Sequence, residues 1–444
     1  GSEMCIRDRS SLVDQNLASF FGRVNYKLMD RYMLTASLRA DGSSVFAPGK
    51  KWGYFPSVAL AWRINEENFL KNVDAISNLK LRLSWGQSGQ CAIDPYQTVG
   101  LLGNSTYSFN NEGAYGFYPK TMSNKELTWE TTTQYNLGLD FGFFNNRISG
   151  SIDIYKAETR DILMNRVIPS INGYASVMEN IGKTESTGVD LTLSTVNIQN
   201  KNFSWFSDFS LSHNREKIKE LASGQLKDEA NAWFVGEPFK VFYDYKKEGI
   251  WQLGEEAAAA ANGQEPGDIK VQDVDGNGVI TTDDRIIYSQ RPDVTFGFNN
   301  TFNYKGFDLS VFLYARLGQW IAYDYNTTYR INALENGGNV DYWTPENPTN
   351  AFPRPNKSKS YTQVTYYSTL KYEDGSFFKI RDITLGYTFK PELLKHLNLS
   401  RLRVYATAKN FFTFSKIDNY DPEQGGSISF PMTKQLVFGL NVEF

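Results

Sequence analysis

The chain contains few of the residues that build disulfide frameworks, metal centres or catalytic triads. Its 444 residues include only two cysteines, Cys5 and Cys91, which are too few for a disulfide framework. The two histidines, His213 and His396, lie far apart in the sequence, so neither a histidine-rich metal site nor a Ser/His/Asp triad is expected. The net charge of −3 leaves no basic excess for binding nucleic acid. The sequence therefore predicts neither an enzyme nor a nucleic-acid-binding protein.

The sequence also lacks a long apolar run and a recognisable signal peptide. A membrane-spanning helix needs about 18 or more consecutive apolar residues, and no segment approaches that length. This excludes a helical membrane protein but leaves a membrane β-barrel open, because barrel strands are apolar only at every second position. The opening GSEMCIRDR differs in pattern from everything after it. We interpret residues 1–10 as a non-native segment and expect the natural N-terminus to be missing.

Alternation of apolar and polar residues is the strongest pattern that is present. Leu79, Leu81 and Leu83, for example, alternate with Lys80 and Arg82. About 13 segments have this period of two, which is typical of strands with one apolar and one polar face. They are 20–28, 34–38, 58–64, 79–85, 135–143, 148–154, 189–193, 203–211, 294–298, 307–313, 383–389, 402–408 and 436–444. The aromatic content of 15% suits strands and membrane–water interfaces.

The connections between these segments alternate between short and long. Short joins include 29–31, 145–146 and 304–306. The long connections are 91–126, 161–178, 215–292, 319–375 and 413–431. Outer-membrane barrels place short turns on the periplasmic side and long loops outside the cell. The sequence therefore predicts an all-β fold, a transmembrane antiparallel β-barrel of about 13 strands with long extracellular loops, and it places Phe444 at the periplasmic end.

A secreted or surface β-sandwich protein that binds glycans is the alternative. Its strands would alternate in the same way, but a sandwich has no reason to sort its connections by length. It would also need soluble domains of roughly a hundred residues separated by linkers, and no such linkers are apparent. The barrel is therefore the preferred prediction.

A set of short segments, in collinear order, supports the barrel. They are FFGRVNYKLMDRYMLTASLRADGSSVF, KWGYFPSVALAWRI, LKLRLSWGQSG, NIGKTESTGVDLTL, GEPFKVFYDYKKEGIWQ, PGDIKVQDVDGNGVITTDDR, FGFNNTFNYKGFDLSVF, YWTPENP, FFKIRDITLGYTF, LRVYATAKNFFTFSKIDNYDPE and LVFGLNVEF. Single motifs of this kind are weak. The ordered set covers nearly the whole chain after Asn16, and it resembles the barrel of the SusC/RagA-type TonB-linked outer-membrane proteins of Bacteroidetes.

The resemblance implies that residues 11–444 form the C-terminal portion of a 22-stranded barrel with a plugged lumen. About nine strands, the plug domain and the segment that contacts TonB would then lie outside this chain. The intact protein would lie in the lipid of the cell outer membrane and import glycans or peptides. A SusD-like lipoprotein would close over its outer side, and TonB would act through the plug.

The long loop 215–292 contains a sequence that is typical of an EF-hand calcium loop. Its candidate ligands, at loop positions 1, 3, 5, 7, 9 and 12, are Asp273, Asp275, Asn277, the carbonyl of Val279, Thr281 and Asp284. Gly278 occupies position 6, where the loop turns sharply. Asp284 departs from the pattern, because a longer Glu is usual there. The spacing predicts a structural calcium site that would rigidify the loop, and a turn-rich loop without metal is the alternative.

Two further features could suggest a function, but each has a simpler explanation. The acidic pairs Glu66-Glu67 and Asp283-Asp284 could indicate glycosidase chemistry, yet no second carboxylate can be placed at a defined separation. Two long loops are rich in aromatic residues, namely Tyr107, Phe109, Tyr115, Phe117 and Tyr118, and Trp320, Tyr323, Tyr325, Tyr329, Tyr342 and Trp343. For these we favour packing between loops, or a place in the interfacial aromatic belt, over substrate binding.

Overall fold

The structure of the chain is a computed structural model. It describes residues 13–174, 176–332, 336–394 and 399–444. The segment 1–10, interpreted above as non-native, and His396 lie outside the described residues. Within the described ranges, no helix is both long and apolar enough to cross a membrane.

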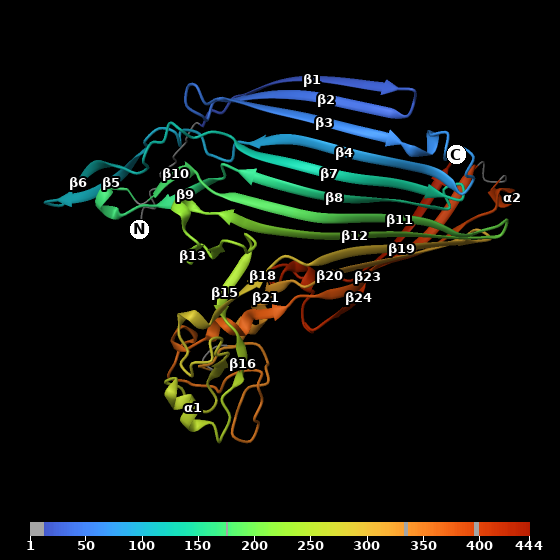
Figure 1. Ribbon diagram of the computed structural model, residues 1–444. Helices are drawn as coiled ribbons and strands as arrows, with labels where there is room; N and C mark the ends of the chain where they lie inside the picture. The colour runs from blue at the N-terminus through green and yellow to red at the C-terminus, as the bar shows by residue number, and fades with distance from the viewer. Residues whose placement is uncertain (1–12, 175, 333–335, 395–398) are drawn as a thin grey trace.

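Thirteen strands form a single antiparallel sheet, in which they are ordered as they are in the chain (Figure 1). They are β1 (Leu17–Leu28), β2 (Tyr32–Ser43), β3 (Trp52–Arg63), β4 (Ile76–Gln90), β7 (Glu130–Phe143), β8 (Ile148–Arg160), β11 (Lys183–Gln199), β12 (Phe203–Glu220), β19 (Val294–Tyr304), β20 (Phe307–Leu317), β23 (Phe377–Thr388), β24 (Arg401–Ser415) and β25 (Gln435–Glu443). Each coincides with one of the segments predicted from alternation. The all-β antiparallel fold is confirmed, and these thirteen strands form one sheet rather than separate sandwiches.

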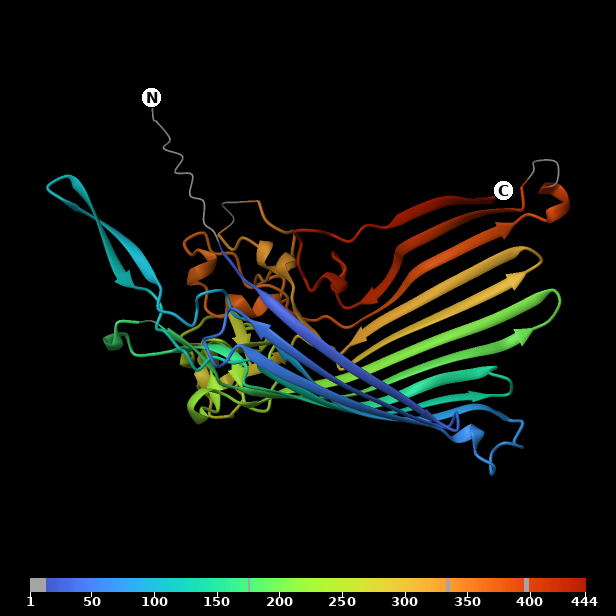
Figure 2. The same cartoon turned by 90° about the horizontal axis from the view of Figure 1, so that it is seen from above.

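The sheet curls into an open trough (Figures 1 and 2). β1 and β25 form its two edges, and no other strand of the described residues pairs with the free side of either. The convex face of the trough corresponds to the outside of a barrel and the concave face to its lumen. The chain therefore supplies a part of a barrel wall.

All connections of more than 12 residues lie at the same end of the trough. At one end lie the short connections, 29–31, 64–75, 144–147, 200–202, 305–306 and 389–400. At the other end lie 44–51, 91–129, 161–182, 221–293, 318–376 and 416–434. The predicted parity is therefore observed, and we call the second end extracellular. The long third loop begins at residue 221 rather than 215, because β12 stays paired with β11 as far as Glu220 opposite Lys183.

The connections contain short elements of their own. The ribbons pair β5 (Leu102–Phe109) with β6 (Glu112–Pro119), β9 (Leu163–Val167) with β10 (Ser176–Asn180), β13 (Lys227–Asp228) with β14 (Trp233–Phe234), β15 (Val241–Tyr245) with β18 (Arg285–Ser289), β16 (Lys247–Ile250) with β17 (Ile269–Val271), and β21 (Trp320–Ala322) with β22 (Tyr372–Asp374). The helices are α1 (Glu256–Ala261), α2 (Pro391–Leu394), η1 (Ile64–Glu66), η2 (Ser170–Asn172), η3 (Ala222–Gly224), η4 (Thr282–Asp284), η5 (Asp324–Thr328), η6 (Tyr361–Gln363), η7 (Tyr367–Lys371) and η9 (Pro422–Gln424).

A bulge in β23 changes which side chains face the lumen. Ile380 pairs with Leu313 and Asp382 pairs with Phe312, so Arg381 has no partner on β20. A bulge adds one residue to a strand whose side chains alternate with a period of two, and it therefore reverses the phase beyond it. As a result, Lys379 lies on the inner face, although regular alternation would place it on the outer face with Ile383 and Leu385, which are also at odd positions.

Candidate functional site

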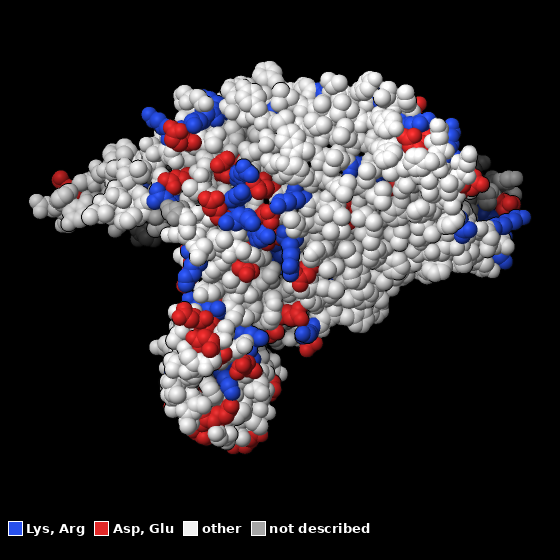
Figure 3. Space-filling model, in the orientation of Figure 1, with Lys and Arg blue, Asp and Glu red and all other residues white. Residues whose placement is uncertain are grey.

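The outer face of the wall is apolar across its middle. Successive outward positions of β25 and β24 pair Leu440 with Val404 and Phe438 with Ala406. Phe438 and Leu440 expose 78% and 61% of their surface, which is unusual for a whole face in water but normal against hydrocarbon. Figure 3 shows that the outer face has few charged side chains between a charged zone near the loops and another near the turns. This is the band that a bilayer would cover.

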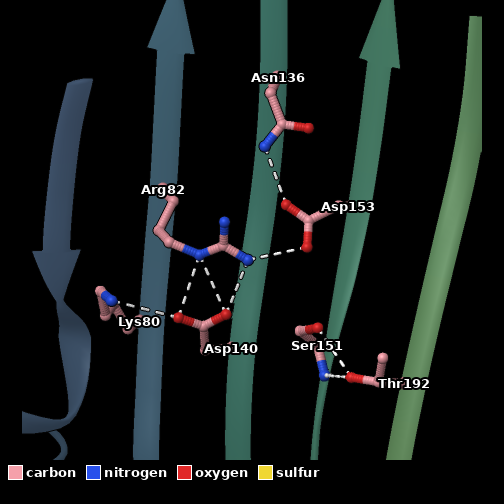
Figure 4. A network of polar contacts seen from close by, with 7 residues as sticks. All are labelled: Lys80, Arg82, Asn136, Asp140, Ser151, Asp153 and Thr192. Carbon is pink, nitrogen blue, oxygen red and sulfur yellow. Dashed lines mark hydrogen bonds and ion pairs between the residues drawn. The ribbon is translucent and has the colours of Figure 1, made fainter. Parts of the chain in front are cut away.

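The inner face of the wall holds a ladder of charges (Figure 4). Arg82 of β4 donates to Asp140 of β7 from Nε and Nη2, over 2.8 to 3.0 Å, and from Nη2 to Asp153 of β8 over 2.9 Å. Lys80 lies 3.3 Å from Asp140, and Asn136 donates to Asp153 over 2.8 Å. The ladder crosses three strands, and its hydrogen-bonding capacity is directed into the trough. A polar solute passing along this wall would meet charged groups that are already in place.

Glycine permits this ladder to cross a strand. Gly138 lies on β7 in register between Arg82 and Asp153. A Cβ at Gly138 would lie 2.5 Å from the Asp153 carboxylate and 2.6 Å from the Arg82 guanidinium carbon, closer than real Cβ contacts. Gly386 has the same role on β23, where a Cβ would lie 2.5 Å from both Arg403 and Asp308. An arginine that reaches a carboxylate two strands away across a glycine therefore occurs twice on the inner wall.

Replacing Gly138 by Val is expected to destabilise the wall. The added side chain would force Arg82 away from Asp153 and leave that carboxylate without its charged partner. Overpacking of this kind costs about 1–3 kcal/mol. The measurement is urea unfolding of the membrane-inserted protein, followed by the change in its electrophoretic migration. Gly22→Val is the matched control, because a Cβ there meets nothing within 4 Å. Equal unfolding midpoints for the two variants would contradict this account.

The loop between β24 and β25 is fastened to the inner wall by a buried lysine. Lys379 has no exposed side-chain surface, and its Nζ lies 2.6 Å from Asp421 and 2.7 Å from Glu423. Arg381 adds a contact of 3.2 Å to Glu423. These acids lie on and beside η9, so the contacts hold that short helix against β23. Sequence analysis did not single out Lys379. The sequence does mark this lysine by a change in the alternation of apolar residues. Phe378 and Ile380 lie at even positions, whereas Ile383 lies at an odd position.

Two long loops interlock at the extracellular end into one lobe, residues 241–290, 320–332 and 336–374, which we call the loop lobe (Figure 1). Its buried core contains Ile250, Ile269, Val271, Trp343, Tyr367 and Leu370, drawn from both loops. Asn350 accepts from the Ile250 N–H, and the Trp343 indole donates to Gln252 over 2.9 Å. The lobe is therefore a small packed unit, although it has little regular secondary structure.

The two groups of loop aromatics have different environments. Tyr323, Tyr329 and Trp343 expose only 4–6% of their surface and pack inside the extracellular loops, as expected. By contrast, Tyr107, Phe109 and the other aromatics of the first group lie on the β5–β6 hairpin, which projects from the body (Figures 1 and 2). Tyr107 and Phe109 are each 65% exposed. The packing prediction is thus confirmed for the three buried residues but not for the hairpin or for Tyr342, which is 43% exposed.

The predicted calcium loop brings three of its candidate ligands together. Carboxylate oxygens of Asp273, Asp275 and Asp284 all lie within 4.8 Å of one another. Among the described residues this is the one group of three such side chains close enough to share a metal ion. The Gly278 N–H donates to Asp273 over 2.7 Å, which draws the sharp turn around the first ligand. The carboxylates thus surround one point, as the spacing predicts.

The remaining candidate ligands are less directly placed. The Asn277 amide nitrogen donates to Asp275 over 2.8 Å, so its oxygen would have to turn toward an ion. Thr281 contacts Asp284 mainly through its backbone N–H. Asp284 is fully buried, and the N–H groups of Thr281 and Val274 hold its pKa below the usual range. It is therefore a charged oxygen donor available at neutral pH.

The acidic pairs have structural partners rather than catalytic geometry. Glu67 accepts hydrogen bonds from Arg31, Tyr32 and Trp62 at 2.6–3.0 Å, and it fastens the β3–β4 connection to its neighbours. The Tyr32 hydroxyl and the Trp62 indole hold the pKa of Glu67 below its usual value, the opposite of what a general acid needs. In the second pair, Asp284 accepts from the backbone N–H of Thr281, the N-cap residue of η4, and it belongs to the candidate calcium loop.

A wall with an apolar outer face, a charged inner face and its long loops at one end defines an integral outer-membrane β-barrel protein. The family model described as "TonB dependent receptor-like, beta-barrel" matches residues 6–411. The chain therefore belongs to this family, and it is a SusC/RagA-type barrel chain of the outer membrane.

Relatives and solved structures agree with this assignment. The TonB-dependent receptor P26 of Formosa agariphila is 35% identical over 96% of this chain and 46% of its own length. The TonB-dependent receptor SusC of Bacteroides thetaiotaomicron is 35% identical over 99% of this chain and 45% of its own length. The structure of the RagAB peptide transporter aligns with a TM-score of 0.81 at 27% identity, over 97% of this chain and 48% of that chain. The chain thus spans about half the length of the curated relatives it matches.

Proposed function

We propose that this chain forms part of the barrel of a TonB-dependent importer that carries glycans or peptides across the outer membrane. The observation that carries the proposal is the ladder of Lys80, Arg82, Asp140 and Asp153, which directs charge and hydrogen-bonding groups into the trough while the outer face is apolar. Such a wall suits a polar solute larger than an ion. Similarity to SusC and to a peptide transporter supports the same class of cargo.

The proposal includes two partners. A plug domain would close the lumen and contact TonB, and relatives about twice as long as this chain leave room for it. A SusD-like lipoprotein would cover the extracellular side. The β5–β6 hairpin supports this second partner, because an isolated two-stranded ribbon is at best marginally stable in water and its apolar side chains are exposed. A protein surface laid over the hairpin would bury them.

Uptake by cells tests the import proposal. A strain with the gene deleted is compared with the parent, using one fluorescent pool of oligosaccharides and one of peptides. We expect accumulation of one pool to fall to background in the deletion strain, to return with the wild-type gene, and to stop when a protonophore collapses the energy source of TonB. Accumulation that ignores the protonophore would identify a passive pore, and unchanged accumulation of both pools would contradict import of either class.

We also propose that the loop of Asp273, Asp275 and Asp284 binds calcium, with Asn277, Val279 and Thr281 completing the shell after small rotations. Calcium takes six to eight hard oxygen ligands, and three carboxylates already converge here. The ion would stiffen the base of the loop lobe, because Asp284 contacts the backbone on both sides of the loop through Val274 and Thr281.

Removing one ligand is expected to abolish this binding. Asp275→Asn removes a charge from an exposed ligand, and we expect terbium luminescence at the loop to be lost and protease cleavage within 273–284 to become insensitive to chelator. Asp283→Asn is the matched control, since Asp283 lies in the same loop but outside the carboxylate group. If chelator leaves cleavage of the wild-type loop unchanged, or the control behaves like Asp275→Asn, the calcium proposal is wrong.

A further inference from the structure

The outer face of the wall changes from apolar to charged at the extracellular ends of β8, β11 and β12. The last row without Lys, Arg, Asp or Glu contains Leu137, Ile154, Val189 and His213 side by side. The next outward row toward the loops contains, in register, Tyr135, Lys156, Thr187 and Arg215. Rows on one face are two residues apart, or about 7 Å along a strand. Charge therefore begins one row beyond the hydrocarbon-facing surface (Figure 3).

Basic side chains outnumber acidic ones in this region, which we call the outer charged patch. It consists of Lys156, Glu158, Arg160, Lys183, Glu185, Arg215, Lys217 and Glu220. Glu185 lies 2.8 Å from Lys156 and 3.0 Å from Lys217, which fixes both ammonium groups. Arg215 is exposed and forms no ion pair with any residue that the structure describes. The patch therefore keeps a positive excess after its internal pairs have formed.

The wall is hollowed directly beside the patch. A hollow of about 380 Å³ opens against Leu83, Leu137, Ile154 and Val189, and it extends to Lys156. Leu137 and Ile154 are 46% and 52% exposed, so the hollow presents apolar surface where a bilayer would lie. An apolar depression thus meets a basic rim at the level where the hydrocarbon of the outer leaflet would end.

We propose that the outer charged patch and this hollow bind a phosphate-bearing lipid of the outer leaflet. Lys156 and Arg215 flank the Thr187 hydroxyl on one row, so two cations and a hydrogen-bond donor face a single headgroup. Arginine binds phosphate through two parallel N–H groups, and lysine does so as a point charge. The acyl chain lies over Leu137, Ile154 and Val189. Lys217 adds positive charge one row farther out.

A second copy of this chain is a poorer occupant of the same surface. A symmetric dimer would place this patch opposite itself, and the excess positive charge would then face the same excess. Like charges brought together across an interface oppose association. A lipid phosphate has the opposite sign, and its attached chain matches the adjacent hollow. The proposal concerns the outside of the wall, so it does not depend on which solute the lumen carries.

Lipid retention by the membrane-inserted protein tests the proposal. The protein is placed in nanodiscs of phosphatidylcholine containing diphosphorylated lipid A, and retained lipid is counted by native mass spectrometry. We expect the double variant Lys156→Gln/Arg215→Gln to retain lipid A roughly 10- to 30-fold more weakly than the wild type, because each basic group at a membrane surface contributes several-fold to binding. Ile154→Ala is expected to weaken retention through the hollow while leaving the cations in place.

The control variant removes two exposed lysines from turns at the opposite end of the wall, Lys201→Gln/Lys305→Gln, and is expected to retain lipid as the wild type does. Heat-modifiable migration confirms that every variant is folded. Equal retention by the two double variants would overturn the proposal. So would equal retention of dephosphorylated lipid A, or displacement of the lipid by millimolar inorganic phosphate. Loss of a dimer without loss of lipid would assign the patch to contact between copies instead.

Discussion

Replacing Lys379 by Ala is expected to lower the stability of the inner wall by about 3–5 kcal/mol, because removing one member of a buried ionic group leaves the others unpaired. The Lys379 Nζ is the shared partner of Asp421 and Glu423, whose side chains are only 11% and 10% exposed. Without it, two carboxylates would face each other in a space that water scarcely reaches. We expect η9 to leave β23, so hydrogen exchange of residues 416–434 should rise.

Two further variants separate charge from packing at this site. Lys409→Ala is the surface control, because Lys409 is 46% exposed and lies 3.8 Å from Asp382, a pair worth about 1 kcal/mol or less. The triple variant Lys379→Met/Asp421→Asn/Glu423→Gln removes all three charges and should recover most of the lost stability. If the triple variant is as unstable as Lys379→Ala, the lysine acts through its shape and not through its charge.

Replacing Trp343 by Ala is expected to loosen the loop lobe while leaving the barrel wall intact. Trp343 is 4% exposed in a core shared by both loops, and truncation of a buried tryptophan costs about 3–5 kcal/mol. The variant also leaves Gln252 without its indole donor. Hydrogen exchange should rise across 241–290, 320–332 and 336–374 but not along β12 or β19.

The neighbouring tyrosine provides the comparison for this result. Tyr342 is adjacent in the chain but 43% exposed, so Tyr342→Ala should leave exchange in the loop lobe nearly unchanged. A Trp343→Ala variant that also melts the wall would show that the lobe and the barrel fold as one unit. Equal behaviour of the two variants would show that burial at this position does not hold the loops together.

The strands could be predicted from the sequence because hydrocarbon on one side and water on the other impose a period of two on every strand. The same rule failed to place Lys379, since a bulge at Arg381 shifts the phase by one residue and the polar side chain changes face. A search for phase breaks, such as the one between Ile380 and Ile383, would have located it. Alternation in the sequence therefore predicts the face on which a side chain lies only where the strand contains no bulge.

The loops could be predicted only where the residues that come together are close in the sequence. Asp273, Asp275 and Asp284 lie within 11 positions of each other in the chain, and the structure brings them together as that spacing predicts. By contrast, the loop lobe depends on contacts between residues about a hundred positions apart, such as Ile250 with Asn350 and Gln252 with Trp343. No periodicity encodes such pairs. The aromatic residues of buried and exposed loops consequently looked alike in the sequence.

The odd number of strands in the sheet restricts how a barrel could close around it. In a sheet of 13 antiparallel strands the first and last run in the same direction, so β1 and β25 both descend from the loop end to the turn end. Joining them directly would create a parallel seam in an otherwise antiparallel wall. A barrel with an even number of strands and no such seam needs an odd number of additional strands between these two edges. Because β25 ends at the turn end and β1 begins at the loop end, the additional strands would have to connect to these two edges from opposite sides of the membrane.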